Sequence, residues 1–189
     1  GGVFSAQFGM ASVYGTEAGL SVGQISTFVA TVFIGAMITQ YPIGWLSDRV
    51  DRRGLIAVTA AIGALGSAVG AMSGGDFNLI LVAAFLMGST SNPLYSLLLA
   101  YTNDFLNHDD MAAGSGGLMF LNGLGAVSGP LITGWMMGVV GPSGFYVLIG
   151  TLFSLLAVYY LDIGLLTQAD TSKFLLRNID ANDQGVESN

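Results

Sequence analysis

The stretch MAAGSGGLMFLNGLGAVSGPLITGWMMGVVGPSGFYVLIGTLFSLLAVYYL, residues 111–161, contains no Asp, Glu, Lys, Arg or His. A helix needs about 20 apolar residues to cross the hydrocarbon core of a bilayer, and this stretch is long enough to cross twice. Residues 140–142, Val-Gly-Pro, supply a short loop between the two halves of the stretch. The stretch therefore predicts two membrane-spanning helices.

The rest of the chain has a similar composition. Only 9% of all residues are charged and 52% are hydrophobic, and the mean hydropathy is +0.68. Soluble domains carry about 25% charged residues. Between residues 54 and 105 the only ionisable acids or bases are Asp76 and Asp104. A soluble fold of 189 residues would have too much surface for so few charges, so the sequence indicates an integral membrane protein in contact with the lipid bilayer.

Six apolar segments separated by short loops predict an all-α, polytopic membrane protein, a bundle of six transmembrane helices. Short loops favour antiparallel neighbours. Ser21 and Gln24 form a capping-box pattern before the second segment, and a polar break at 88–93 and Gly129-Pro130 interrupt the fourth and fifth. The transmembrane domain is expected at residues 1–163, before a polar cytoplasmic tail at 164–189. The expected helices are residues 1–14, 22–46, 54–72, 77–101, 111–139 and 143–161.

Small residues recur at four-residue spacing within these segments. In a membrane such spacing lets the backbones of two helices approach closely. We therefore expect close helix packing at these positions, with a sliding interface as the alternative. The pairs are Gly63/Ser67, Gly66/Gly70, Gly70/Gly74, Gly125/Gly129 and Gly134/Gly138.

The basic residues predict the orientation of the bundle. Three lie in the loop after the second segment, and two lie beyond the sixth, which is the same side of an up-and-down bundle. Basic loops stay cytoplasmic, so this side and the C-terminus are expected in the cytoplasm. The five residues are Arg49, Arg52, Arg53, Lys173 and Arg177.

Several classes of function are disfavoured. The net charge is −7, and the tail after residue 161 holds five of the 12 acidic residues. An acidic chain poor in basic residues argues against a nucleic-acid partner. Without Cys, and with His108 alone in a loop, no metal site is expected. The chain has no Gly-Lys-Ser/Thr phosphate loop, so ATP is not expected to drive it. Neither an enzymatic activity nor a cofactor is predicted.

The loop after the second segment carries the most specific motif, Gly-Trp-Leu-Ser-Asp-Arg-Val-Asp-Arg-Arg at residues 44–53. It resembles the signature loop of the major facilitator superfamily, Gly-x-Leu-(small)-Asp-Arg-x-Gly-Arg-(Arg/Lys). In that family the loop joins the second and third helices and recurs between the eighth and ninth. Asp51 departs from the pattern, because the family usually has Gly there. Asp tolerates unusual backbone angles better than most residues.

The resemblance implies a role for this loop in a cytoplasmic latch, whose charge pairs hold one conformation and break as two halves of the transporter rock. Gly44 would let a neighbouring helix approach, and Asp48, an acid at the membrane interface, would need a cation or a helix N-terminus. A plain positive-inside loop is the alternative. The latch residues implied are Gly44, Leu46, Asp48, Arg49, Arg52 and Arg53.

The resemblance also implies which part of a transporter this chain represents. Residues 40–44, Gln-Tyr-Pro-Ile-Gly, are similar to the eighth helix of the YcaD-like subgroup of bacterial transporters. The breaks at 88–93 and 129–130 fit the tenth and eleventh helices of the family. We therefore expect the C-terminal six-helix half of a transporter in a bacterial inner membrane, with a missing N-terminal six-helix half as its partner. The start at Gly1-Gly2 without Met and the short first segment agree with a truncated chain.

Polar residues in the middle of apolar segments are candidates for substrate binding, because transporters place their substrates near the bilayer midplane beside broken helices. A simple hydrogen bond between helices is the alternative for each. The candidates are Gln7, Asn92, Tyr95 and Asn122. The favoured function is secondary active transport of a small-molecule solute by alternating access. The alternative is a small homo-oligomeric membrane channel or a structural membrane protein.

Overall fold

The computed structural model describes residues 1–106 and 111–162, and these form helices joined by short connections. The predicted all-α fold class is confirmed, since no strand occurs among the described residues. A sixth helix, Gly144–Asp162, follows five labelled ones. The labelled helices are α1 (Gly2–Glu17), α2 (Val22–Ser47), α3 (Arg52–Ala71), α4 (Phe77–Asn103) and α5 (Met111–Val140).

Five of these helices are long and apolar enough to cross a membrane: α2, α3, α4, α5 and the sixth helix. α1 has 16 residues. The expected polar tail, His108, Lys173 and Arg177 lie outside the described residues.

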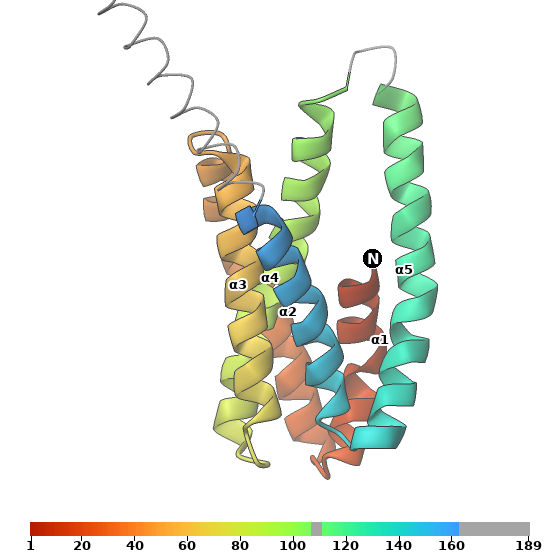
Figure 1. The fold of residues 1–189 in the computed structure, drawn as a ribbon. Helices are drawn as coiled ribbons and strands as arrows, with labels where there is room; N and C mark the ends of the chain where they lie inside the picture. The colour runs from red at the N-terminus through yellow and green to blue at the C-terminus, as the bar shows by residue number, and fades with distance from the viewer. Residues whose placement is uncertain (107–110, 163–189) are drawn as a thin grey trace, which may run out of the picture.

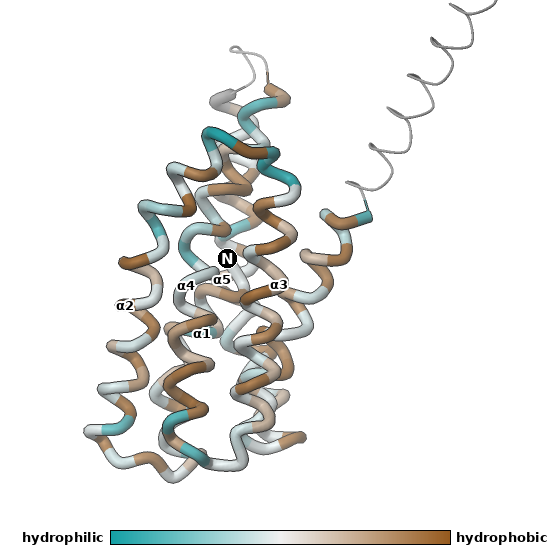
Figure 2. Tube along the Cα trace, turned by 90° about the vertical axis from the view of Figure 1, so that its left-hand side faces the viewer, coloured by the Kyte–Doolittle hydropathy of each residue, from teal (hydrophilic) through white to brown (hydrophobic). Residues whose placement is uncertain are grey.

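The helices run up and down side by side (Figure 1). We call the end of the bundle that holds residues 48–51 and the C-terminus of α4 the motif end. The connections 18–21 and 72–76 lie at the opposite end. Hydrophilic residues gather toward the two ends and hydrophobic residues cover the helix bodies, as Figure 2 shows. This distribution is the one that a membrane-spanning bundle requires.

α4 lies at the centre of the packing. It packs most extensively against α2 and α3, and α1 packs mainly against α5. Half or more of the residues in the apolar spans of α3 and α4 are buried (50% and 56%), against only 22% in α2 and 17% in α5. The surface of the bundle that lacks protein contacts is therefore concentrated on α2 and α5.

Glycines allow the close crossings between helices. A Cβ atom on Gly88 of α4 would overlap the carbonyl of Val32 in α2, and one on Gly35 of α2 would overlap the carbonyl of Phe85 in α4. The two backbones therefore meet with no room for a side chain.

The pairs of small residues differ in how closely a neighbouring helix packs against them. A Cβ on Gly63, Gly66 or Gly70 would press on a neighbouring side chain, and one on Gly125 or Gly129 would press on the start of α1. Gly74 and Gly138 have no neighbour within 4 Å, and Gly74 adopts a positive φ of 58° in a connection. Close packing thus occurs at some of these pairs and not at all of them.

The expected interruptions of the fourth and fifth helices were wrong, because α4 and α5 run continuously through Pro93 and Pro130. Proline has no N–H, so Pro93 leaves the carbonyl of Ser89 without its helical donor. The hydroxyl of Thr39 in α2 lies 2.7 Å from this carbonyl and 2.8 Å from the carbonyl of Gly35 in its own helix, so its single proton is shared between the two. A neighbouring helix thereby satisfies the freed backbone group, as membrane helices require.

Thr39→Val is expected to lower the free energy of unfolding by about 1 kcal/mol, because it keeps the shape of the side chain and removes this interhelical donor. Thr31→Val is the matched control, since the Thr31 hydroxyl donates to Thr27 of its own helix. Thermal unfolding of the purified protein in detergent measures both. Equal effects of the two substitutions would contradict the role assigned to Thr39.

Candidate functional site

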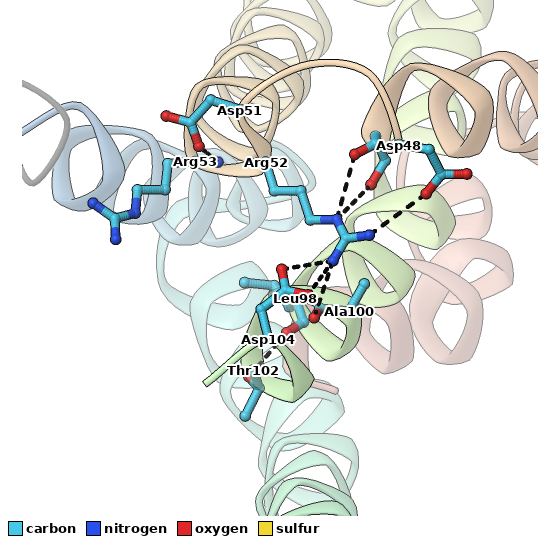
Figure 3. A network of polar contacts seen from close by, with 9 residues as sticks. Asp48, Asp51, Arg52, Arg53, Leu98, Ala100, Thr102 and Asp104 are labelled. Atoms are coloured by element: carbon cyan, nitrogen blue, oxygen red, sulfur yellow. Dashed lines mark hydrogen bonds and ion pairs between the residues drawn. The ribbon is translucent and has the colours of Figure 1, made fainter. Parts of the chain in front are cut away.

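The first part of the site is a charge cluster around Arg52 at the motif end (Figure 3). Arg52 begins α3, and its Nη1 atom donates to both carboxylate oxygens of Asp104 at 2.6 Å. Its Nη2 atom lies 3.5 Å from Oδ1 of Asp48, at the end of α2. One guanidinium therefore links α3 to the C-terminal ends of α2 and α4.

Arg52 also contacts the backbone of both helix ends. Its Nε atom lies 3.4 Å from the carbonyl oxygen of Ser47, and Nη1 lies 3.4 Å from that of Ala100. The last carbonyls of a helix lack helical donors and carry partial negative charge, so a cation placed there is stabilised. Arg52 thus contacts the C-termini of two helices and the carboxylates of two aspartates at the same time.

Asp51, the residue that departs from the family pattern, has a local structural role. It is the N-cap of α3, where its carboxylate accepts a hydrogen bond from the Arg53 N–H at 3.0 Å. Its φ is −58°, so this turn needs no left-handed backbone and therefore no glycine.

The remaining motif residues take other positions. The guanidinium of Arg49 lies 3.9 Å from the centroid of the Trp45 ring, and that of Arg53 lies 5.7 Å from the Tyr101 ring. Leu46 is half-buried against the core. Gly44 has no neighbour within 4 Å, so among the described residues no helix makes the close approach expected there.

The second part of the site is a space between α1, α2, α4, α5 and the sixth helix, bounded on one side by Gly1, Gly2, Val3 and Phe4 at the start of the chain. Three of the four polar candidates line it together: Asn92 and Tyr95 from α4, and Asn122 from α5. These side chains are half-buried or exposed, so their polar groups can reach a molecule in the cavity. Ser91 of α4 lines the same wall.

Gln7, the fourth candidate, does not line this cavity. It is completely buried in α1, and the Ser91 hydroxyl donates to its Oε1 atom at 2.5 Å. Its Nε2 atom has no partner among the described residues. The hydrogen bond to Gln7 therefore fixes the side chain of Ser91, which lines the cavity, while Gln7 itself stays buried in the packing.

A smaller cavity of about 290 Å³ lies between α2 and α4 and continues from the larger one toward the motif end. The two cavities share Gln40 and Ser96. The smaller one is also lined by Asp48 and Arg52 of the charge cluster. The smaller cavity thus shares lining residues with the larger cavity on one side and with the charge cluster on the other.

Sequence reasoning missed Asp104 as the main partner of Arg52. A signal for it was present, because Asp104 is one of only two Asp, Glu, Lys, Arg or His residues between 54 and 105. It lies at the C-cap of α4. A carboxylate at a helix C-terminus is electrostatically unfavourable unless a cation is near. Gln40 and Ser96 were missed as well.

No group of three or more His, Cys, Asp or Glu that could hold a metal ion occurs within residues 1–106 and 111–162.

Comparison with known proteins identifies the family. The family model described as Major Facilitator Superfamily matches residues 1–176. The MFS-type transporter YfkF of Bacillus subtilis is 30% identical over 130 residues, 66% of this chain and 32% of that protein. The triacylglyceride transporter of Mycobacterium tuberculosis is 30% identical over 118 residues, 60% of this chain and 23% of that protein. YcaD of Escherichia fergusonii, also an MFS-type transporter, is 25% identical over 135 residues, 71% of this chain and 34% of that protein.

The chain therefore spans about a third or less of the length of these relatives. The family match covers most of the chain, and it agrees with the apolar helices and with the loop at 44–53. The chain is a multi-pass membrane protein that belongs to the Major Facilitator Superfamily of transporters.

Proposed function

We propose that this chain is the C-terminal half of a secondary active transporter that moves a small solute across a bacterial inner membrane by alternating access. The carrying observation is the convergence of Asn92, Tyr95 and Asn122 on one cavity within an apolar bundle. Ligand sites combine a mostly apolar lining with a few convergent polar groups. Transporter substrates bind near the bilayer midplane.

A second six-helix half would complete the site. The relatives are about three times as long as the matched segment, which supports such a partner. α2 and α5 expose large apolar side chains that this half would cover, among them Met37, Tyr41 and Trp135. Gly44, with open space around it, offers a place for a helix of that half to approach.

The charge cluster would act as the latch. Arg52 holds the ends of α2, α3 and α4 together through polar contacts at the surface, and such contacts break at low cost when helix ends move apart. The basic residues at 49, 52 and 53 support a cytoplasmic motif end, and therefore a cytoplasmic C-terminus.

The test is uptake by the complete transporter reconstituted in proteoliposomes. A panel of labelled small solutes is screened with and without a proton gradient, and uptake of at least one solute is expected. Accumulation that depends on the gradient identifies the coupling ion. If no solute enters faster than into protein-free liposomes, the proposal is wrong.

Asn92→Leu is expected to reduce uptake of that solute at least about 10-fold, because a polar group of the solute loses its partner in a site sheltered from water. Asn78→Leu is the control, since Asn78 is exposed at the start of α4, away from the cavity. Initial uptake rates are compared at equal amounts of monodisperse protein. An unchanged rate for Asn92→Leu would remove Asn92 from the binding site.

A further inference from the structure

α4 lacks one backbone hydrogen bond within its length, at Pro93. Proline has no N–H, so the carbonyl of Ser89, one turn earlier, has no donor within its own helix. Sharp bends in helices occur mostly at such positions. We call residues 94–103, which follow Pro93 to the end of α4, the α4 arm.

The part of α4 before Pro93 is fixed by close contacts with two helices. A Cβ atom on Gly88 would overlap the carbonyl of Val32 in α2, so the two backbones touch there. A Cβ atom on Gly66 of α3 would lie 2.7 Å from the Cβ atom of Leu86 in α4. Close-packed interiors leave no room for small shifts. A movement within α4 is therefore expected to begin after residue 88.

The α4 arm is held at its far end by polar contacts. Nη1 of Arg52 lies 3.4 Å from the carbonyl oxygen of Ala100 and 2.6 Å from the carboxylate of Asp104, directly after the arm (Figure 3). Such contacts at the surface break at low cost. The buried side chains of the arm, Leu94 and Leu97, lie close to Pro93, where a bend displaces atoms least. The arm can therefore tilt once Arg52 lets go of its end.

The Thr39 hydroxyl has two acceptors for one proton. It lies 2.7 Å from the Ser89 carbonyl and 2.8 Å from the Gly35 carbonyl of its own helix. In a helix the Gly35 carbonyl also accepts from a backbone N–H, whereas Pro93 leaves the Ser89 carbonyl without one. The proton is therefore most stabilising on Ser89. The hydroxyl still keeps a hydrogen bond when it turns to Gly35.

We propose that α4 bends at Pro93 when the Arg52 contacts open, and that Thr39 stabilises the straight form. In the straight form the Thr39 hydroxyl donates to the Ser89 carbonyl. In the bent form it donates to the Gly35 carbonyl alone. Thr39 is a positioning residue, since it acts through α4 and touches no solute. This inference rests on the proposed function, because the bend is a step in alternating access.

Two spin labels measure the bend, because the chain contains no Cys to compete for them. Val50→Cys places one label in the connection between α2 and α3, and Phe105→Cys places the other just beyond the arm. Both positions are exposed (45% and 64%). The arm is about 15 Å long, so a bend of about 20° moves its end by about 5 Å. Double electron–electron resonance gives the distances in the complete transporter in nanodiscs, with any Cys outside this chain replaced by Ser.

Thr39→Val is expected to raise the ratio of bent to straight α4 about five-fold, the effect of losing one hydrogen bond. Thr39→Ser keeps the hydroxyl and should retain the distances of the parent protein. Thr31→Val is the matched control in the same helix, because the Thr31 hydroxyl donates to the Thr27 carbonyl. It is expected to leave the distances unchanged.

Pro93→Ala is expected to act in the opposite direction, because alanine restores the N–H that the Ser89 carbonyl lacks. The bent population should fall at least about five-fold, and uptake of the solute should slow several-fold. Pro130→Ala makes the same chemical change within α5. It is expected to leave the distance between the two labels unchanged.

Unchanged distances in both Thr39→Val and Pro93→Ala would overturn the proposal. So would shifts of equal size in Pro130→Ala or in Thr39→Ser. If Thr39→Val fails to fold, Pro93→Ala decides, because it adds a hydrogen bond and removes none. A bend without uptake of any solute would contradict the proposed transport and leave the hinge standing. Uptake at the parent rate with α4 held straight by Pro93→Ala would do the reverse.

Discussion

Gly88→Ala is expected to lower the free energy of unfolding by about 1 to 3 kcal/mol, the usual cost of forcing an extra carbon into a packed site. The added Cβ would overlap the carbonyl of Val32, which belongs to the backbone of α2 and cannot rotate away. α2 and α4 would have to separate, and α4 is the centre of the packing. Thermal unfolding of the purified protein in detergent measures the loss.

Gly123→Ala is the control for this substitution. Gly123 lies within α5 with no neighbour within 4 Å. Alanine forms helices better than glycine by about 0.5 to 1 kcal/mol, so this variant is expected to be as stable as the parent protein or slightly more stable. The same chemical change should therefore have opposite signs at the two positions. A loss of similar size at both would show that the α2–α4 crossing is not the cause.

Asp104→Asn is expected to shift the equilibrium between the latched and the unlatched conformation about five-fold toward the unlatched one. The free energy of unfolding should change by less than about 1 kcal/mol. The Asp104 side chain is 49% exposed, so its pairing with Arg52 adds little to folding. It does tie the ends of α3 and α4 together at the motif end. The chain contains no Cys, so a single Ser96→Cys substitution reports on the cavity. Its labelling by a maleimide added from the motif side should be about five-fold faster in the Asp104 variant.

Two comparisons separate the latch from the net charge of the loop. Asp51→Asn removes the same charge, but Asn still caps α3, so labelling should stay at the parent rate. Asp48→Asn should have a smaller effect than Asp104→Asn, because Asp48 lies 3.5 Å from Arg52 and is 71% exposed. Exchanging the charges, with Arg52→Asp and Asp104→Arg together, should restore slow labelling. Equal acceleration by Asp51→Asn and Asp104→Asn would refute the latch.

The fold class followed from the sequence because long apolar segments have few alternatives in a membrane. The ends of the helices depend on single side chains and are harder to predict. α3 begins at Arg52 and not near residue 54, because the Asp51 carboxylate caps it inside what was expected to be a charged loop. The continuity of α4 through Pro93 depends on Thr39, which is far away in the chain. No local pattern contains that information.

Only part of the candidate site could be predicted from the sequence. Asn92, Tyr95 and Asn122 stand out as polar residues in apolar segments, and the cavity brings them together. Gln7 gives the same signal, yet it is buried between helices. α1 is apolar nearly all round, so its sequence does not indicate which face points at the cavity. Asp104 was missed because its partner lies on another helix, and only the fold brings the two together.

The contact between Thr39 and the Ser89 carbonyl couples positions 39 and 93, which lie on different helices. Because Pro93 leaves this carbonyl without its helical donor, losing the hydroxyl at 39 is expected to cost more with proline at 93 than with a residue that has an N–H. Replacing Pro93 with alanine first should make Thr39→Val nearly harmless.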